Sequence, residues 1–247
     1  MLLTQTTTPE DVKALNRAEL PQLCDEIRHA ILESSAAVGG HVAPNLGVVE
    51  LTVALHRVFN SPIDKIVFDV SHQTYAHKAL TGRAYTYIDP ERYGEASGFA
   101  NPDESEHDLF AMGHTSTSVS LGCGLAHARD LAGDTYNVIT IIGDGSLSGG
   151  LAFEGLDNAA ELDSNLIIIV NDNDQSIAIW PSCAPATAPV SATFSARWGS
   201  TTAIWTPATM CWPWSTRCRS CAISIIPSCC TSPPQRARAL SQPRATP

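Results

Sequence analysis

The chain has 247 residues and a net charge of −10 at pH 7, from 25 acidic and 15 basic side chains. Residues 1–178 hold every acid and nine of the bases, whereas residues 179–247 hold six arginines and no other charge. Such an acidic N-terminal unit argues against nucleic acid or an anionic membrane as a partner. No signal-peptide pattern and no long apolar run occur, so we expect a cytoplasmic protein. Cys24 and Cys123 are too few for a disulfide framework and fit a reducing compartment.

Three helices are predicted in the first 60 residues. Thr8 is a predicted N-cap, because Pro9 and two acids follow it at the first helical turn. Apolar residues at spacings of three and four then predict a helix from Leu20 that ends near Gly39. A third helical pattern begins at Asn45 and is stopped by the Asn-Ser-Pro run at 60–62.

The rest of residues 1–178 reads as a parallel α/β unit. Short β-branched or continuous apolar runs at 65–70, 137–144 and 165–172 predict strands buried on both faces of a sheet. Helices are predicted at 116–131 and 151–162, with an irregular stretch at about 83–108. Strand, helix and strand over 137–172 form a βαβ unit. We therefore expect an α/β fold with a parallel sheet flanked by helices.

Polar residues follow two of these strands and predict a metal and phosphate site. Asp144 and Gly145 follow the first strand, and Asn173 lies just after the second. Because parallel strands end at one sheet edge, a carboxylate and an amide oxygen would meet there, as Mg²⁺ bound to a diphosphate prefers. Each half alone is also compatible with a tight turn and a capping Asp. The 29-residue spacing from Asp144 to Asn173 resembles the thiamine diphosphate motif of the transketolase-like superfamily.

Longer segments resemble one family within that superfamily, 1-deoxy-D-xylulose-5-phosphate synthase. The segments are GGHVAPNLGVVELTVALHRVF (39–59), DVSHQTYAHKALTGR (69–83), SEHD (105–108), MGHTSTSVS (112–120) and GDGSLSGGLAFEGLDNAAELDSNLIIIVNDNDQSIA (143–178). The resemblance implies a thiamine diphosphate-binding fold and a transferase that uses thiamine diphosphate and Mg²⁺. The implied reaction joins pyruvate, with decarboxylation, to glyceraldehyde 3-phosphate at the entry to isoprenoid biosynthesis. It also implies a homodimer for the full-length enzyme.

The resemblance also implies roles for individual residues. The implied Mg²⁺ ligands are Asp144, Asn173 and the backbone carbonyl of Gln175. Cofactor contacts are implied for Gly113, His114, Thr115, Gly145, Ser146 and Asn173. His72 is implied to contact the cofactor and to act in catalysis, and His41 to act on the substrate, because histidine can donate to phosphate or carry a proton near neutral pH.

Other residues have no such match or depart from the family pattern. His56, His77 and His127 are expected to be solvated or to cap helices, and Lys78 to be a surface charge. Ser71, Thr115 and Ser146 stand where the family usually has Gly, Ser and Ala. At 101–103 a basic pair common in the family is missing.

Residues 179–247 differ in kind from the domain at 1–178. They contain all five Trp and six of the eight Cys, and they have no helical or strand periodicity, so we expect a disordered or irregular tail. Codons can be chosen for residues 222–230 that, when read in a frame shifted by one base, encode DIDHPVVL. This sequence resembles the family's next strand, so we interpret the tail as a frameshift product. The alternatives are a disulfide module and a metal site built on four cysteines, Cys218, Cys221, Cys229 and Cys230. A natural split subunit of a transketolase-type enzyme and a non-functional relict remain as alternative functions.

Overall fold

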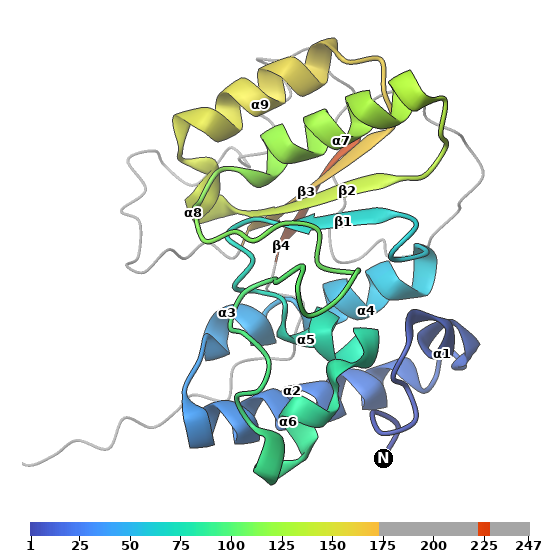
Figure 1. Ribbon diagram of the computed structural model, residues 1–247, viewed down its shortest axis with the longest axis vertical. Helices are drawn as coiled ribbons and strands as arrows, with labels where there is room; N and C mark the ends of the chain where they lie inside the picture. Colours follow the sequence, from blue (N-terminus) through green and yellow to red (C-terminus); the bar gives the residue numbers. More distant parts are fainter. Residues whose placement is uncertain (173–221, 228–247) are drawn as a thin grey trace, which may run out of the picture.

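A computed structural model describes residues 1–172 and the backbone of 222–227 (Figure 1). Four parallel strands lie in the order β1 (Lys65–Phe68), β2 (Val138–Gly143), β3 (Leu166–Asp172) and β4 (Ala222–Pro227). The expected parallel sheet is therefore present. Strand β4 lies within the range expected to be irregular, and its six residues pair with β3. The other residues of the tail, including its cysteines, lie outside the described residues.

Two helices cover one face of the sheet. Helix α7 (Ser118–Ala132) packs on β2, and α9 (Gly150–Glu161) packs beside α7. Their buried side chains form one apolar cluster with alternate residues of the strands, such as Ile142 and Ile168. This alternation follows from the two-residue period of a strand. The short helix α8 (Asp144–Leu147) joins β2 to α9.

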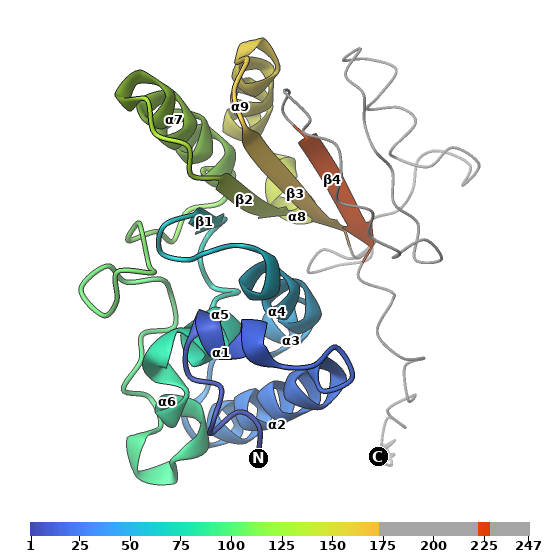
Figure 2. The same ribbon diagram turned by 90° about the vertical axis from the view of Figure 1, so that its right-hand side faces the viewer.

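A helical layer lies against the opposite face (Figure 2). It contains α1 (Pro9–Ala14), α2 (Leu20–Val38), α3 (Val42–Leu46) and α4 (Val49–Val58). Leu55 and Phe59 at the end of α4 join Ile139 and Ile141 of β2 in a second apolar cluster. Thr8 caps α1 as predicted, and Asp11 completes the capping box. No helix of the described residues is long and apolar enough to cross a membrane.

The third predicted helix is divided in the structure. Helix α3 ends at Leu46 and α4 begins at Val49, so Asn45 lies inside α3 and does not begin a helix. A run of short helices that the sequence did not predict follows β1: α5 (Tyr75–Lys78), the π-helical turn η1 (Ala79–Arg83), α6 (Tyr85–Ile88) and the 3₁₀ turn η2 (Pro90–Arg92). An irregular connection then runs from residue 93 to α7.

Candidate functional site

Of the three predicted metal ligands, Asp144 is the one within the described residues, and it lies at the carboxyl edge of the sheet. Gly143 of β2 is in register with Asn171 of β3, and Asp144 comes directly after Gly143. Asp172 is the last residue of β3, and both acids are half-buried. Asn173 and Gln175, the other predicted ligands, lie outside the described residues. Within the described part of the chain, no group of three His, Cys, Asp or Glu side chains is arranged to hold a metal ion.

The turn that carries Gly145 and Ser146 is held in place by Ser116. The Ser116 hydroxyl donates a 2.5 Å hydrogen bond to the carbonyl oxygen of Ser146. Ser116 has a left-handed backbone, with φ +70°, which turns the chain into α7. A Cβ at Gly149 would lie only 2.0 Å from the Ser116 hydroxyl oxygen, so this close approach requires glycine.

Asp69, directly after β1, fixes the start of α7. Its carboxylate accepts hydrogen bonds of 2.9 Å from three consecutive backbone N–H groups, those of Ser116, Thr117 and Ser118. These N–H groups have no partner within the helix, and a carboxylate suits the positive end of the helix dipole. Asp69 was not singled out from the sequence, because its partners lie 47 to 49 residues away. The loops after β1 and β2 are therefore connected through the segment before α7.

The predicted cofactor-contacting residues Gly113, His114 and Thr115 lie in that segment. All three are exposed, and a Cβ at Gly113 would meet no atom within 4 Å. The Thr117 hydroxyl donates to the His114 carbonyl oxygen at 3.1 Å and shapes the turn. The space beside the Gly113 backbone is therefore open.

His41 and His72 come together at a second corner of the site. Their ring centroids are 5.4 Å apart, and the Phe99 ring lies 5.1 Å from that of His41. Burial and the nearby His41 lower the pKa of His72, although Asp69 opposes this shift. Nδ1 of His72 is buried and has no hydrogen-bond partner in the described part of the chain. A buried nitrogen without a partner is a feature that a bound polar group would satisfy.

Asn45 holds this corner together. Its side-chain NH₂ donates to the carbonyl oxygens of His41, at 2.6 Å, and His72, at 2.8 Å. Its side-chain oxygen accepts the N–H of Tyr75 at 2.9 Å. The side chain is fully buried and connects the start of α3 to the segment from His72 to Tyr75. The sequence carried only a weak signal for this role, because an Asn within a helical pattern is usually a cap.

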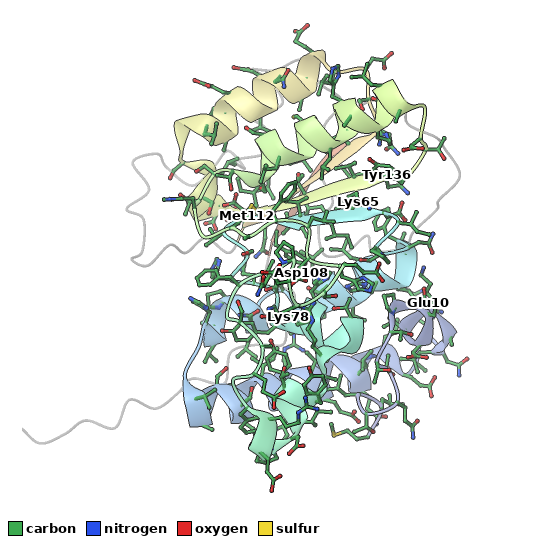
Figure 3. The ribbon with its side chains drawn as sticks, viewed as in Figure 1. Glu10, Lys65, Lys78, Asp108, Met112 and Tyr136 are labelled. Carbon is green, nitrogen blue, oxygen red and sulfur yellow. The ribbon has the colours of Figure 1, made fainter. Side chains whose placement is uncertain are left out.

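A buried charged network lies beside the corner and corrects three predictions. Lys78, His56 and His77 are all 2% exposed or less, so none of them is a surface residue. The Lys78 ammonium lies 2.7 Å from a Glu104 carboxylate oxygen, and Figure 3 shows Lys78 and Asp108 below the sheet. The surface positions predicted for these side chains were wrong because the residues that bury them are distant along the chain. His127, by contrast, is exposed, as expected.

Asp108 is the centre of this network. Arg83 donates two hydrogen bonds to its carboxylate, at 2.7 and 2.8 Å, and the N–H of Asn101 donates a third. Burial by itself would raise the pKa of Asp108, but Arg83 and the adjacent His77 hold it well below its usual range. The network thereby fixes the irregular connection to the short helices after β1.

Comparisons with known proteins find matches to the N-terminal part of the chain. A family model described as 1-deoxy-D-xylulose-5-phosphate synthase matches residues 3–181. Relatives of that name from Symbiobacterium thermophilum and Pelotomaculum thermopropionicum are 56% and 50% identical to this chain over 178 and 177 residues. Both alignments cover 72% of this chain, and the chain spans about 28% of the length of these relatives.

The solved structures give a likeness in fold. A transketolase from Leishmania mexicana superposes with a TM-score of 0.63 at 16% sequence identity. The superposition covers 83% of this chain and 36% of the transketolase chain. The parallel sheet flanked by helices is therefore an arrangement found in a transketolase.

Proposed function

Because this chain belongs to the 1-deoxy-D-xylulose-5-phosphate synthase family, we propose that residues 1–178 form the part of such an enzyme that binds the diphosphate of thiamine diphosphate. The full-length enzyme would condense pyruvate with glyceraldehyde 3-phosphate, with loss of carbon dioxide, as a cytoplasmic homodimer. The observation that carries this proposal is the contact from Ser116 to Ser146, since it joins the loops after β1 and β2 around one edge of the sheet.

The donors at this edge fit a metal-bound diphosphate. Asp144 offers a carboxylate at the end of β2, and Mg²⁺ is bound through one or two such oxygens together with phosphate oxygens. Asn173 and the carbonyl of Gln175 complete the proposed ligand set. Gly145 and Ser146 would contact the diphosphate, and Gly113, His114 and Thr115 would line the cofactor.

The two histidines serve the reacting end of the proposed site. Thiamine diphosphate, when bound, supplies a group that stabilises a carbanion. Burial lowers the pKa of His72, which favours the neutral ring, and a neutral ring can donate a hydrogen bond through one nitrogen and accept one through the other. His41 would hold or transfer a proton at the substrate. The rings of Phe99 and His72 both pack edge-on against the ring of His41.

The proposal predicts that Asp144 is needed to retain the cofactor. A chimera would carry residues 3–178 of this chain in place of the matching segment of a full-length relative. Asp144→Asn in this chimera should weaken Mg²⁺-dependent retention of thiamine diphosphate by at least about tenfold. Even the loss of a residue that only hydrogen-bonds to a metal ligand lowers metal affinity by about tenfold or more. Equilibrium dialysis with and without Mg²⁺ measures the effect.

Asp157→Asn is the matched control, because Asp157 is an exposed acid on α9 away from the sheet edge. It should leave retention of the cofactor unchanged. Equal retention by the Asp144→Asn chimera and the parent chimera, with both folded, would refute the assignment of Asp144.

A further inference from the structure

The Tyr75 hydroxyl makes two contacts with one residue, His41. The backbone N–H of His41 donates to the Tyr75 oxygen at 3.1 Å, and Nδ1 of the His41 ring lies 3.3 Å from the same oxygen. Tyr75 is buried, with 6% of its surface exposed. Its hydroxyl proton therefore cannot rely on solvent for an acceptor.

The direction of the ring contact depends on where the Tyr75 hydroxyl proton goes. The hydroxyl oxygen accepts from the His41 N–H, and its own proton needs a separate acceptor. Nδ1 of His41 is the acceptor available to that proton among the described residues. A neutral imidazole has one donor and one acceptor nitrogen, so an accepting Nδ1 leaves the ring proton on Nε2.

We propose that Tyr75 is a positioning residue that holds His41 as the Nε2–H tautomer. The inference rests on the proposed function only in treating His41 as a residue of the working site. Nε2 of His41 has no hydrogen-bond partner within the described part of the chain. A ligand group that binds at this nitrogen of the neutral ring must therefore be an acceptor, such as a carbonyl, carboxylate or phosphate oxygen.

The surrounding chain is built to allow this contact. A Cβ at Gly40 would lie 2.8 Å from the Tyr75 hydroxyl oxygen, and Gly40 has φ +143°, so glycine is required there for two reasons. Asn45 accepts the Tyr75 N–H and donates to the His41 carbonyl, which fixes both backbones. The Tyr75 ring also packs on Tyr87, with 5.6 Å between ring centroids.

The protonation pattern of His41 can be read directly by NMR. The 247-residue chain would be labelled with ¹⁵N-histidine and recorded without cofactor or substrate, at a pH where the His41 ring is neutral. The His41 resonances are identified by their loss in His41→Asn. The proposal predicts a pyridine-type shift for Nδ1 and a pyrrole-type shift for Nε2. A pyrrole-type Nδ1 would overturn it, with no variant needed.

Tyr75→Phe then separates a held tautomer from an intrinsic preference. Without the hydroxyl, the Nδ1 resonance should move, because it loses its hydrogen bond and the second tautomer becomes populated. Tyr87→Phe is the control, since Tyr87 is equally buried and packs on Tyr75; it should leave the His41 resonances in place. An unchanged Nδ1 resonance in folded Tyr75→Phe would contradict the proposal. Because no cofactor is present, these outcomes are independent of the Asp144 test.

Discussion

Ser71 has a left-handed backbone, with φ +67°, although it carries a Cβ, and the preceding Val70 is also left-handed, with φ +58°. Such a conformation costs about 1–2 kcal/mol for a residue other than glycine. The Ser71 hydroxyl donates to the Met112 carbonyl oxygen and accepts the Ala100 N–H, both at 3.1 Å. These hydrogen bonds connect two parts of the segment before α7 and offset the strain.

The strain and the hydrogen bonds at Ser71 predict that its alanine and glycine variants differ in stability. Ser71→Ala loses both hydrogen bonds and keeps the strain, so it should lower the free energy of unfolding by about 1–3 kcal/mol. Ser71→Gly loses the same hydrogen bonds but relieves the strain, so it should be more stable than Ser71→Ala by about 1 kcal/mol. Urea unfolding of both variants measures this order. The account of Ser71 is wrong if the alanine variant is the more stable.

His56 makes stability depend on pH. Burial, together with His77, His107 and Lys13 around it, lowers the pKa of His56 well below its ordinary value. As the pH falls through about 6.5, His56 becomes protonated in the unfolded chain but stays neutral in the folded chain. The free energy of unfolding is therefore highest above that pH and decreases as the pH falls. Below pH 6.5 one such histidine lowers stability by at most about 1.4 kcal/mol per pH unit.

His56→Gln should therefore flatten the decline in stability from pH 7 to pH 5, measured by urea unfolding at each pH. His29→Gln is the control, because 74% of the His29 side chain is exposed. An equal decline in the His56→Gln variant and the parent chain would show that His56 does not cause it.

Sequence reasoning at this scale succeeded where a residue's role is local and failed where its partners are distant. Thr8 was identified as a cap because its partner Asp11 is three residues away. Lys78 and His77 were assigned to the surface because a charged or polar side chain is usually solvated. Their burial depends on Glu104 and Asp108, which come from the irregular connection 26 and 31 residues later.

At the scale of elements, the packing of α7 on the sheet depends on one glycine. A Cβ at Gly122 would lie 2.1 Å from the Thr140 methyl carbon on β2, whereas a Cβ at Gly124 would meet no atom within 4 Å. Gly122→Ala should therefore push α7 from the sheet and destabilise the fold by about 1–3 kcal/mol. Gly124→Ala should stabilise it by about 0.5–1 kcal/mol, because alanine favours a helix.

Thermal unfolding of the two variants provides the comparison, since each is the other's control on the same helix. Opposite shifts in midpoint are expected. A Gly122→Ala variant as stable as Gly124→Ala would contradict the close packing of α7 on β2.

The long elements could be predicted, but the short ones could not. The strands β2 and β3 show continuous apolar runs, and helix α2 is long enough to show an apolar period. Helix α7 was predicted from its many small residues, and α9 from the helical length of the segment between two strands. The turns from Tyr75 to Arg92 are three to five residues each, too short for a period to show. Asn45 shows a further limit: as a predicted helix start it was wrong, because its side chain bonds to the backbones of His41, His72 and Tyr75.

At the scale of the molecule, the family match and the charge distribution divide the chain at nearly the same place. The family model ends at residue 181, and the last acid of the chain is Asp174. We propose that residues 179–247 are read from a shifted frame, and 222–227 of that range form β4 beside β3. The proposed Mg²⁺ ligands Asn173 and Gln175 lie outside the described residues, so the sheet edge is the part of the site that the structure supports.

Replacement of the N-terminal segment in a full-length relative is the most direct test of the central claim. The chimera with residues 3–178 of this chain would be given pyruvate, glyceraldehyde 3-phosphate, Mg²⁺ and thiamine diphosphate, and 1-deoxy-D-xylulose 5-phosphate would be measured. We predict turnover within about tenfold of the parent relative, which corresponds to a change in barrier of less than about 1.4 kcal/mol. A folded chimera that forms no product above the rate without enzyme would contradict the account.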